Sequence, residues 1–315
     1  MILPNSLINL LIGLDIGGTK TTIVAGNKKL QIIDRFEFQT NPEHGFDDFF
    51  ERVLNHISKI SASHLLGAIG VSVGGPLDVK RGILYNPPHL GWGTVYLLDE
   101  MRKHFKCPIK VEHDAKAGAI AEFKLGAGKG LKNIVFLTLG TGLGAGIIIN
   151  GQIYRGSNNI AGEIGHMRIS DHGPNVYNKT GSWESYCSGD GIAKLANYMF
   201  PDRFDKKITT KEIAKLANSG DEKATEVLKE SGKYLGIGMA NLFDILDPDR
   251  IILGSLSLRL PNIWLEEAKR MVKREALDGE RAVNRIIKSL LGEQIGDYAA
   301  LLVASKALKE VKNGS

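Results

Sequence analysis

The sequence predicts an α/β protein of two related domains, because two glycine-rich stretches of the same design each open one half of the chain. One is LLIGLDIGGTKTTIVAG at residues 10–26, and the other is IVFLTLGTGLGAGIIINGQIY at residues 134–154. In each, an apolar β-branched run precedes a cluster of Gly and Thr and a second apolar run follows it, which is typical of strand, turn and strand. A length of 315 residues suffices for two domains.

The glycine turns favour phosphate binding, because backbone N–H groups without a neighbouring Cβ let phosphate oxygens approach the main chain. Two such turns indicate a phosphate gripped between the two domains, although either turn alone could simply join two strands. A P-loop is excluded, because Thr19 separates Gly18 from Lys20 and a strand-like run follows. Residues 140–145 match the dinucleotide-binding fingerprint in residue type, but that motif must be followed directly by a helix. Residues 146–151 instead contain β-branched residues that run into an Asn-Gly hairpin turn, so this motif is excluded as well.

The composition is that of an ordinary folded protein, with 43% hydrophobic and 24% charged residues. The formal net charge of +5 is spread along the chain, which suits an anionic substrate such as a nucleotide and gives no sign of nucleic-acid recognition. Cys107 and Cys187 lack partner-like spacing, so we expect a reduced, cytoplasmic setting. No apolar run reaches transmembrane length, and the apolar start, which lacks a basic segment, is interpreted as part of the first strand rather than as a signal peptide.

The first half of the chain continues as alternating strands and helices. Apolar residues at helical spacing predict a helix from Phe46 to Ile60, and a buried strand at 66–73 runs into the turn Gly74-Gly75-Pro76, where another backbone can approach closely. The other elements expected here are a strand near 30–38, a helix at 94–105, a strand at 109–111 that delivers Glu112, His113 and Asp114, and an Ala-rich helix at 115–125.

The glycine-rich segment 126–130 is a flexible joint and marks the expected domain boundary. We therefore expect a smaller first domain at 1–125 and a larger second domain at 126–295, with a final helix in the segment 296–315 that returns to the first domain. Residues 156–191, rich in Gly, Asn, His and Ser, are predicted to form a long functional loop. The other elements expected in this half are helices at 191–200, 210–219, 221–246 and 261–276, and a buried strand at 250–253 that ends at Gly254 and Ser255.

Two aspartates stand where phosphate chemistry would use them. Asp15 precedes the first glycine turn, and Asp114 stands at the transition from a strand to a helix, where ligands of open α/β sheets gather. One carboxylate can hold Mg²⁺ through retained waters, and the other can take the proton from an attacking hydroxyl. The structural alternative for Asp114 is a plain N-cap of the helix that follows it.

Three polar residues of the long loop could hold a sugar, namely Glu163, His166 and Glu184. Carbohydrate hydroxyls are bound by fixed side chains that can donate and accept hydrogen bonds. Each of them, taken singly, is more often a surface residue. Glu163 lies among glycines, however, and a plain surface loop need not carry the entropy cost of glycine on both sides. We therefore treat all three as candidate sugar contacts.

Taken together, the segments LDIGGTKT, GVSVGGPLD, VEHDAKAGAIAE, LTLGTGLGAGIIING and AGEIGH resemble the ROK family of sugar kinases, and the resemblance covers nearly the entire chain. It implies the actin-like, ribonuclease-H-like two-domain fold, with ATP in an interdomain cleft. It also implies a glucokinase-like ATP:hexose phosphotransferase that uses Mg²⁺, in which Asp114 is the catalytic base for a sugar hydroxyl, typically the 6-hydroxyl. A homodimer is expected only because dimers are frequent in the family.

The resemblance also distributes the other site residues over the chain. The first phosphate motif falls on Asp15, as a water-mediated magnesium ligand, and on Gly17, Gly18, Thr19 and Lys20. The second phosphate motif falls on Gly140, Thr141 and Gly142, and the adenosine contact falls, as a looser match, on Gly254 and Ser255. The substrate contacts fall on Glu163, His166 and Glu184, with Gly75 and His113 as further candidates.

The chain departs from the family at a structural zinc site. The family commonly holds zinc with the His of the Gly-His pair and three Cys in a C-x-C-G-x-x-G-C-x-E segment. Counted back from Glu184, the three cysteine positions hold other residues here, Ser182, Tyr177 and Asn175. None of these is a good zinc ligand, so a tetrahedral site cannot be assembled. We therefore predict no zinc, with His166 left to the sugar and the loop held by packing through Trp183 and Tyr186.

Two further departures concern specificity, because His113 and His89 stand where the family usually has Asn. Imidazole is bulkier and can carry charge near neutral pH. A kinase of an amino sugar such as an N-acetylhexosamine, of fructose or of a cyclitol is therefore an alternative to a hexose 6-kinase, whereas for His89 we favour simple loop packing. A sugar-sensing regulator is a further alternative, since the family includes repressors. Those repressors carry a helix-turn-helix domain before the first phosphate strand, and only about nine residues precede it here.

Overall fold

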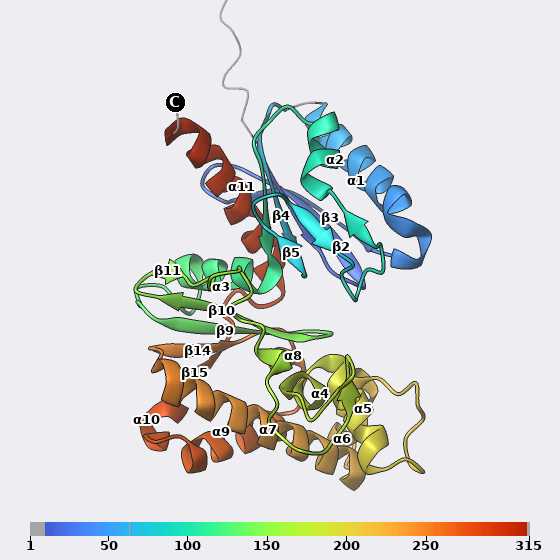
Figure 1. The fold of residues 1–315 in the computed structure, drawn as a ribbon, viewed down its shortest axis with the longest axis vertical. Helices are drawn as coiled ribbons and strands as arrows, with labels where there is room; N and C mark the ends of the chain where they lie inside the picture. Colours follow the sequence, from blue (N-terminus) through green and yellow to red (C-terminus); the bar gives the residue numbers. More distant parts are fainter. Residues whose placement is uncertain (1–9, 63, 314–315) are drawn as a thin grey trace, which may run out of the picture. The chain divides into compact units, whose positions relative to one another are not determined.

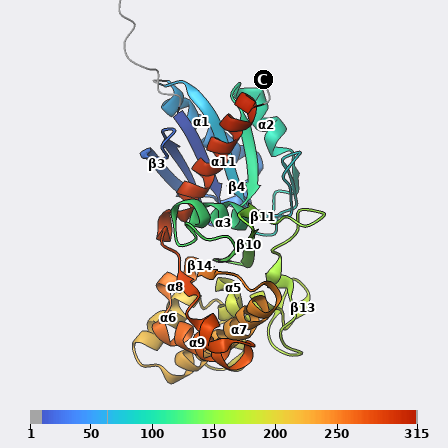
Figure 2. The ribbon, with the colours of Figure 1, turned by 90° about the vertical axis from the view of Figure 1, so that its left-hand side faces the viewer.

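A computed structural model of the chain describes residues 10–62 and 64–313 (Figures 1 and 2). The chain divides into two compact units, one of residues 1–121 with 293–315 and one of residues 122–292. The division falls inside helix α3 (Asp114–Leu125), a few residues before the glycine-rich joint expected from the sequence. The predicted start of the first strand extends to residues 1–9, which lie outside the described residues.

The first unit is built on a five-stranded sheet with the order β3-β2-β1-β4-β8. Strand β1 pairs antiparallel with β2 and parallel with β4, which in turn pairs parallel with β8. The strands are β1 (Leu10–Ile16), β2 (Lys20–Gly26), β3 (Ile32–Gln39), β4 (Leu66–Val73) and β8 (Ile109–His113). The strand–turn–strand prediction and the buried strand at 66–73 are confirmed, because continuous apolar runs suit strands that are covered on both faces.

Alternate residues of β1 face two different helical layers. Leu10, Ile12 and Leu14 belong to the core that includes α1 (Gly45–Ser61) and α2 (Leu97–His104), whereas Leu11 packs with α11 (Ile295–Asn313). Figure 1 shows α1 and α2 on one side of the sheet and α11 on the other. The helix predicted from Phe46 is confirmed, and so is the packing of the last helix on the first unit.

Helix α11 approaches the sheet so closely that two strand positions must be glycine. A Cβ on Gly70 of β4 would overlap the backbone nitrogen of Ala304, and a Cβ on Gly13 of β1 would lie 2.9 Å from the Cβ of Ala300. The close approach brings the first turn of α11 to the carboxyl end of β1. The C-terminal helix thereby becomes part of the surroundings of Asp15.

The helix predicted at 94–105 begins later than expected. Thr94–Val95 forms the short strand β7, which pairs with β6 (Ile83–Tyr85), and β6 pairs with β5 (Leu77–Asp78). Two consecutive residues that include β-branched Val95 favour a strand once a partner strand is available. Helix α2 therefore starts only at Leu97.

The second unit repeats the design with the sheet order β11-β10-β9-β14-β15. Strands β9 and β10 form the second glycine hairpin, and the Asn150-Gly151 turn that follows has φ angles of 51° and 76°, as a two-residue hairpin of this kind requires. The strands are β9 (Ile134–Leu139), β10 (Leu143–Ile149), β11 (Gln152–Ile153), β14 (Arg250–Leu253) and β15 (Ile286–Lys288). The prediction of a second strand–turn–strand and of the strand at 250–253 is confirmed.

The helices of the second unit gather on one face of its sheet (Figures 1 and 2). Two of them begin at caps that the sequence contains, a capping box from Thr209 to Glu212 and an N-cap at Asp221. The four predicted helices are found, within two residues at each end, as α5 (Gly189–Met199), α6 (Thr210–Asn218), α7 (Glu222–Leu246) and α9 (Asn262–Glu275). Within the part of the chain that the structure describes, no helix is both long enough and apolar enough to span a bilayer.

The segment 156–191 is more ordered than the long loop that we expected. It contains the 3₁₀ turn η2 (Ile164–His166), the hairpin of β12 (Asn175–Val176) and β13 (Lys179–Thr180), and helix α4 (Trp183–Cys187). The sequence also gave no signal for α8 (Leu256–Arg259) and α10 (Gly279–Val283). Elements of five residues or fewer are too short for periodicity to detect, and their neighbours stabilise them.

Candidate active site

The first glycine turn is a tight connection between β1 and β2. The N–H of Gly17 donates to the carbonyl of Lys20 at 3.0 Å, and the hydroxyl of Thr40 donates to the carbonyl of Gly17 at 2.7 Å. Gly18 lies against the loop of His89, since a Cβ on Gly18 would be 2.9 Å from the Cβ of His89. The backbone of His89 therefore packs on this turn, as the sequence interpretation favoured, and Gly18 must remain without a side chain.

Lys20 stands at the start of β2 and forms an exposed ion pair. Its Nζ lies 3.0 Å from Oε2 of Glu37, which also receives a bond of 2.7 Å from Arg35. These two cations hold the pKa of Glu37 below its usual range, Arg35 having the larger effect. An ion pair this exposed contributes little to stability. The Lys20 ammonium can therefore leave Glu37 at little cost in stability.

Asp15 lies near the carboxyl end of β1, in register with Ser72 of the parallel strand β4. The Ser72 hydroxyl donates to the Asp15 carboxylate, and the carboxylate fills the space that a Cβ on Gly296 of α11 would need. Burial raises the pKa of Asp15 from 3.8 to about 6, and the nearby charges of Asp114 and Asp297 act in the same direction. Its ionised form is thus poorly solvated, and a cation would relieve that.

Asp114 is the first residue of α3, directly after β8, and its side chain is 42% exposed. Its Oδ1 accepts the N–H of Ala115 at 2.7 Å and lies 3.1 Å from Nδ1 of His113. Its Oδ2 is 3.9 Å from the position that a Cβ on Gly74 would take. The carboxylate therefore bonds the next residue of its own helix through one oxygen, not the second or third amide that an N-cap would bond, and presents the other oxygen to the Gly74-Gly75 turn.

His113 is the last residue of β8, and its ring lies against Gly75. A Cβ on Gly75 would be 3.1 Å from Cδ2 and 3.2 Å from Nε2 of that ring. The first unit thus brings together four of the residues singled out from the sequence, Asp15, Gly75, His113 and Asp114. Their grouping follows from the parallel pairing of β1, β4 and β8, whose carboxyl ends meet at one edge of the sheet.

The second glycine turn joins β9 to β10 and is supported by main-chain bonds from the start of α5. The N–H of Gly189 donates to the carbonyl of Gly140 at 2.8 Å, and the N–H of Asp190 donates to the carbonyl of Thr141 at 3.2 Å. Within the described part of the chain, a Cβ on Gly140 would meet no atom within 4 Å. The turn therefore presents an open backbone face at Gly140.

Glu184 and η2 meet at the end of this second turn. Oε2 of Glu184 accepts the N–H of Leu143 at 2.8 Å, and Gly165 of η2 packs directly on the Leu143 carbonyl. Glu163 precedes η2 and His166 ends it, and both side chains are exposed. The candidate sugar residues of the second unit are therefore gathered next to its glycine turn.

The glycines around Glu163 have a reason that the sequence did not reveal. Gly162 has φ +98°, and its carbonyl accepts the N–H of Ala145 at 2.8 Å. A side chain on Gly162 would overlap the Ala145 carbonyl. These glycines therefore let the loop lie along β10, which is a packing requirement and does not by itself indicate a ligand.

Gly254 and Ser255, the looser match to an adenosine contact, follow β14. The N–H of Gly254 donates to the carbonyl of Leu137 at 2.9 Å, and the Ser255 hydroxyl donates to the carbonyl of Leu139 at 3.0 Å. Leu139 is the last residue of β9 and precedes the second glycine turn. Both residues are thus anchored next to that turn.

The residues at the zinc positions do not suit a metal site. The Ser182 hydroxyl caps α4 by accepting the N–H of Ser185, and the Asn175 amide donates to Thr180 at 3.3 Å. The ring of Tyr177 is inclined by 26° to that of His166, with a distance of 6.4 Å between the ring centroids. Among residues 10–62 and 64–313, no three His, Cys, Asp or Glu side chains are grouped to hold a metal ion.

Packing holds the loop through the two aromatic residues expected from the sequence. Trp183 is fully buried in the core of the second unit. The Tyr186 hydroxyl donates to the carbonyl of His172 at 2.6 Å, and the Tyr186 ring occupies the space in front of Gly173.

Sequence reasoning missed the residues that support the site from neighbouring strands. Thr40 lies just after β3 and holds the first turn, Ser72 lies in β4 and bonds Asp15, and Asp297 lies in the first turn of α11. Asp297 accepts a bond of 2.8 Å from Arg35, and burial raises its pKa. A short-range motif cannot reveal these residues, because strand register and the return of α11 bring them to the site.

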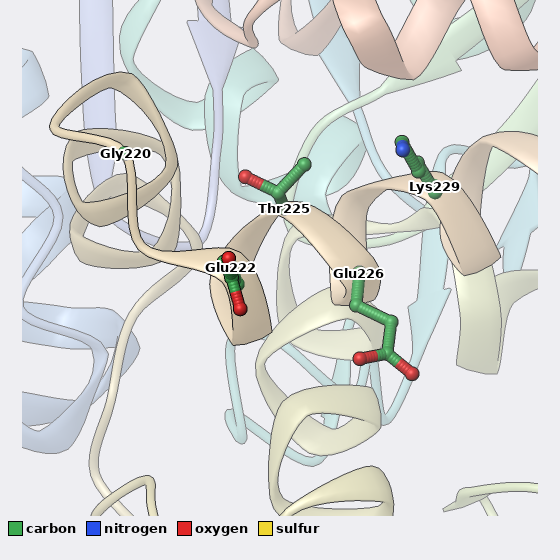
Figure 3. A pocket seen from close by; sticks show the side chains of 5 residues that line it. All are labelled: Gly220, Glu222, Thr225, Glu226 and Lys229. Carbon is green, nitrogen blue, oxygen red and sulfur yellow. The ribbon is translucent and has the colours of Figure 1, made fainter.

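A surface hollow at the start of α7 is separate from all of these residues. It has a volume of about 300 Å³ and is lined by Gly220, Glu222, Thr225, Glu226 and Lys229 (Figure 3). The Thr225 hydroxyl donates to the Asp221 carbonyl, and Glu226 pairs with Lys223 at 3.2 Å. Since these side chains bond their own helix, the hollow adds no candidate residue.

Comparison with known proteins agrees with this arrangement. The ROK family matches residues 11–307. The chain is 32% identical to a glucokinase of Halalkalibacterium halodurans over 77% of this chain and 79% of that protein. It is 33% identical to a xylose repressor of Bacillus spizizenii over 68% of this chain and 54% of the repressor.

Among solved structures, a ROK family glucokinase from Streptomyces griseus in complex with glucose and AMPPNP superposes with a TM-score of 0.80 at 29% identity, covering 94% of this chain and 99% of that one. The fold is therefore the two-domain, actin-like and ribonuclease-H-like α/β fold that the resemblance implied. With two glycine hairpins at corresponding places in two α/β units and a family match over nearly its whole length, the chain belongs to the ROK family.

Proposed function

We propose that the chain is an ATP-dependent sugar kinase that transfers the γ-phosphate to a hexose hydroxyl, with the 6-hydroxyl of glucose as the first substrate to test. The observation that carries the proposal is the position of Asp114. Its carboxylate is accessible, stands at the end of a parallel strand, and lies beside Asp15 and the Gly74-Gly75 turn. The similarity to ROK glucokinases supports the same function.

In the proposed reaction, Asp114 accepts the proton of the sugar hydroxyl as the hydroxyl oxygen attacks the γ-phosphorus. The bond between that phosphorus and the β,γ-bridging oxygen breaks, and the products are a sugar phosphate and ADP. Backbone N–H groups of Gly17–Thr19 and of Gly140–Gly142, with the Lys20 ammonium, neutralise the phosphate charge. Gly254 and Ser255 are proposed to contact the adenosine.

The residues around Asp15 fit a magnesium ion bound through water. Hard carboxylate oxygens suit Mg²⁺, and the pKa of Asp15 is raised mainly by burial, which disfavours the ionised carboxylate and which a bound cation would offset. When bound, the ion would neutralise charge on the phosphate oxygens. Asp15 would orient its water ligands, and Ser72 would hold the Asp15 carboxylate in place.

The sugar is proposed to contact Glu163, His166 and Glu184 from the second unit and His113 and Gly75 from the first. His113 packs on Gly75 and touches Asp114, so its imidazole affects the shape of the site next to the base. An amino sugar, fructose or a cyclitol is therefore an alternative substrate. A coupled assay across glucose, N-acetylhexosamines, fructose and inositol with MgATP identifies the substrate by its kcat/KM.

Asp114→Asn tests the proposed base, because the amide keeps the size of the side chain and loses its basicity. We expect kcat to fall about 10²-fold to 10⁴-fold, the contribution of a positioned general base, with the sugar dissociation constant within about twofold of wild type. The two quantities are measured by coupled assay and by calorimetry. Retention of more than about a tenth of wild-type kcat would show that Asp114 is not the base.

A sugar-sensing regulator is the second candidate, favoured by the similarity to the xylose repressor. A regulator needs a sugar site but no phosphoryl transfer. The same assay separates the two functions: sugar binding without ATP consumption across the whole panel would favour the regulator. A gel shift with the neighbouring promoter at moderate salt would then test sequence-specific DNA binding.

A further inference from the structure

His166, a proposed sugar contact, is held from several sides by residues of its own unit. Its N–H donates to the carbonyl of Glu163 at 3.2 Å, which closes η2. Lys179 Nζ donates to the His166 carbonyl, and the ring of Tyr177 lies nearly parallel to the imidazole, with an angle of 26° between their planes. Both the peptide and the ring of His166 are therefore held by the short hairpin β12–β13.

Tyr177 occupies a turn position that does not suit its residue type. Asn175 pairs with Thr180, and Val176 with Lys179, so Tyr177 and Asn178 alone form the turn, with φ angles of 49° and 58°. Turns with two left-handed residues favour Asn, Asp and Gly. A tyrosine in this region carries a steric cost of about 1 kcal/mol or more. The turn alone therefore does not explain Tyr177, whereas the contact of its ring with His166 does.

The hairpin itself is firmly attached to the second unit. Val176 is buried, and Arg168 donates to the carbonyl of Thr180 at 2.9 Å. A side chain on Gly181 would overlap the Ser170 carbonyl, so the backbone at the base of the hairpin is closely packed. An anchored hairpin can fix the orientation of a neighbouring exposed side chain, which a mobile loop cannot.

Tyr177 also lies close to a second proposed sugar contact. Burial raises the pKa of its hydroxyl to about 12, and the charges of Glu184 and Asp190 act in the same direction. The hydroxyl is therefore neutral at ordinary pH and can donate a hydrogen bond. Tyr177 thus stacks on His166 and lies within electrostatic range of Glu184.

We infer that Tyr177 and Lys179 are positioning residues that fix His166 for sugar binding without a metal ion. That His166 contacts the sugar rests on the proposed function. That Tyr177 and Lys179 hold His166 rests on the contacts in the structure. The zinc that the family resemblance implies finds no suitable donors here. One of the positions that would hold a zinc-binding cysteine instead supplies the ring that stacks on His166.

The test removes the ring without disturbing the turn. Tyr177→Gly suits the left-handed conformation, so the hairpin should remain intact. Tyr177→Phe keeps the ring, and Asn178→Gly, at the other left-handed position of the same turn, is the matched control. The first readout is the His166 ring resonance in the full-length protein, assigned with His166→Gln. The second is the affinity for the sugars of the panel by calorimetry without nucleotide, in the presence of EDTA.

We expect Tyr177→Gly to shift the His166 resonance and to weaken sugar binding about threefold to tenfold, the range that an aromatic stack contributes. Tyr177→Phe and Asn178→Gly should stay within about twofold of wild type. An unmoved His166 resonance in Tyr177→Gly, or an unchanged sugar affinity, would overturn the inference, as would loss of wild-type sugar binding on adding EDTA. If wild type binds no sugar of the panel, the proposed function fails. The His166 resonance alone then decides whether Tyr177 positions the His166 ring.

Discussion

The two glycine turns have the same sequence design but different supports. In the first unit, the turn at Gly17–Thr19 is held by one residue, Thr40, and by the loop of His89 packed on Gly18. The Thr40 hydroxyl donates to the carbonyl of Gly17, and the Thr40 N–H donates to the carbonyl of Thr19 at 2.9 Å. In the second unit, the turn at Gly140–Gly142 is held by main-chain N–H groups of Gly189 and Asp190. The Glu184 carboxylate adds a bond to Leu143 at the end of that turn.

This difference implies that substitutions near the two turns should affect different sets of proposed ligands. Segment 184–190 supports the second turn and also carries Glu184, so the proposed nucleotide contacts and the proposed sugar contact share one framework there. Thr40 lies in a different strand connection from Asp114 and supports the first turn alone. Changes in the second unit should therefore affect both ligands together, whereas changes at the first turn should affect the nucleotide.

The largest expected effect is that of Glu184→Ala. The substitution removes a proposed sugar contact and also the acceptor of the Leu143 N–H, and hydrogen bonds to a charged group contribute about 1.5–3 kcal/mol each. We expect kcat/KM to fall about 10²-fold, with KM raised for both the sugar and MgATP. Steady-state kinetics with each substrate varied in turn measures both constants.

Thr40→Val is the matched control for Glu184→Ala, because it keeps the shape of the side chain and removes the hydroxyl, which donates to Gly17 and also bonds the Thr21 hydroxyl at 3.0 Å. It should raise KM for MgATP by about fivefold, the value of one neutral hydrogen bond, and leave the sugar affinity unchanged. If Glu184→Ala altered only the sugar constant, the shared framework of the second unit would be contradicted.

A smaller and more local contrast comes from alanine at one glycine of each turn. Gly18→Ala would force the His89 backbone to move, and we expect it to lower the free energy of unfolding by about 1–3 kcal/mol. Gly140→Ala has open space and should change that free energy by less than about 0.5 kcal/mol, while raising KM for MgATP. Urea unfolding and kinetics of both variants provide the comparison. Equal destabilisation by the two substitutions would show that the turns have the same surroundings after all.

The sequence predicted the parts of the fold whose signal lies in consecutive residues. Strands β4 and β14 were located to the residue, because runs of buried apolar residues need no further information. The hairpin β12–β13 and helix α4 were missed, because each is held by contacts distant in sequence, such as the burial of Trp183 and the bond from Arg168 to Thr180.

The same distinction applies to the candidate site. Asp15 and Asp114 could be proposed from their positions at strand ends, which the sequence reveals. Their partners could not, because Ser72 reaches Asp15 only through the register of β1 with β4, and Asp297 only through the return of α11. A carboxylate can thus be identified from sequence, whereas its pKa depends on the tertiary fold.

The smallest expected effect concerns Asp15, which stands two residues before Gly17, whereas the uncharged Thr138 stands two residues before Gly140. Burial raises its pKa from 3.8 to about 6, so the folded chain binds this proton more tightly than the unfolded chain does. The contribution of Asp15 to stability is therefore most favourable below about pH 4 and is lost as the pH rises to about 6.

Asp15→Asn removes this titration and keeps an oxygen that can accept the Ser72 hydroxyl. Relative to wild type, the variant should gain on the order of 1 kcal/mol of unfolding free energy between about pH 4 and pH 8, less than the full pKa shift implies because the carboxylate is partly solvated. Urea unfolding of the ligand-free protein at both pH values measures the gain. The Gly140→Ala variant is the control, because that substitution neither adds nor removes a titrating group. A difference between Asp15→Asn and wild type that is the same at both pH values would mean that Asp15 is ionised as easily in the folded chain as in the unfolded one. In that case burial would not disfavour the ionised form of Asp15, and the proposed attraction of a magnesium ion to Asp15 would lose its electrostatic basis.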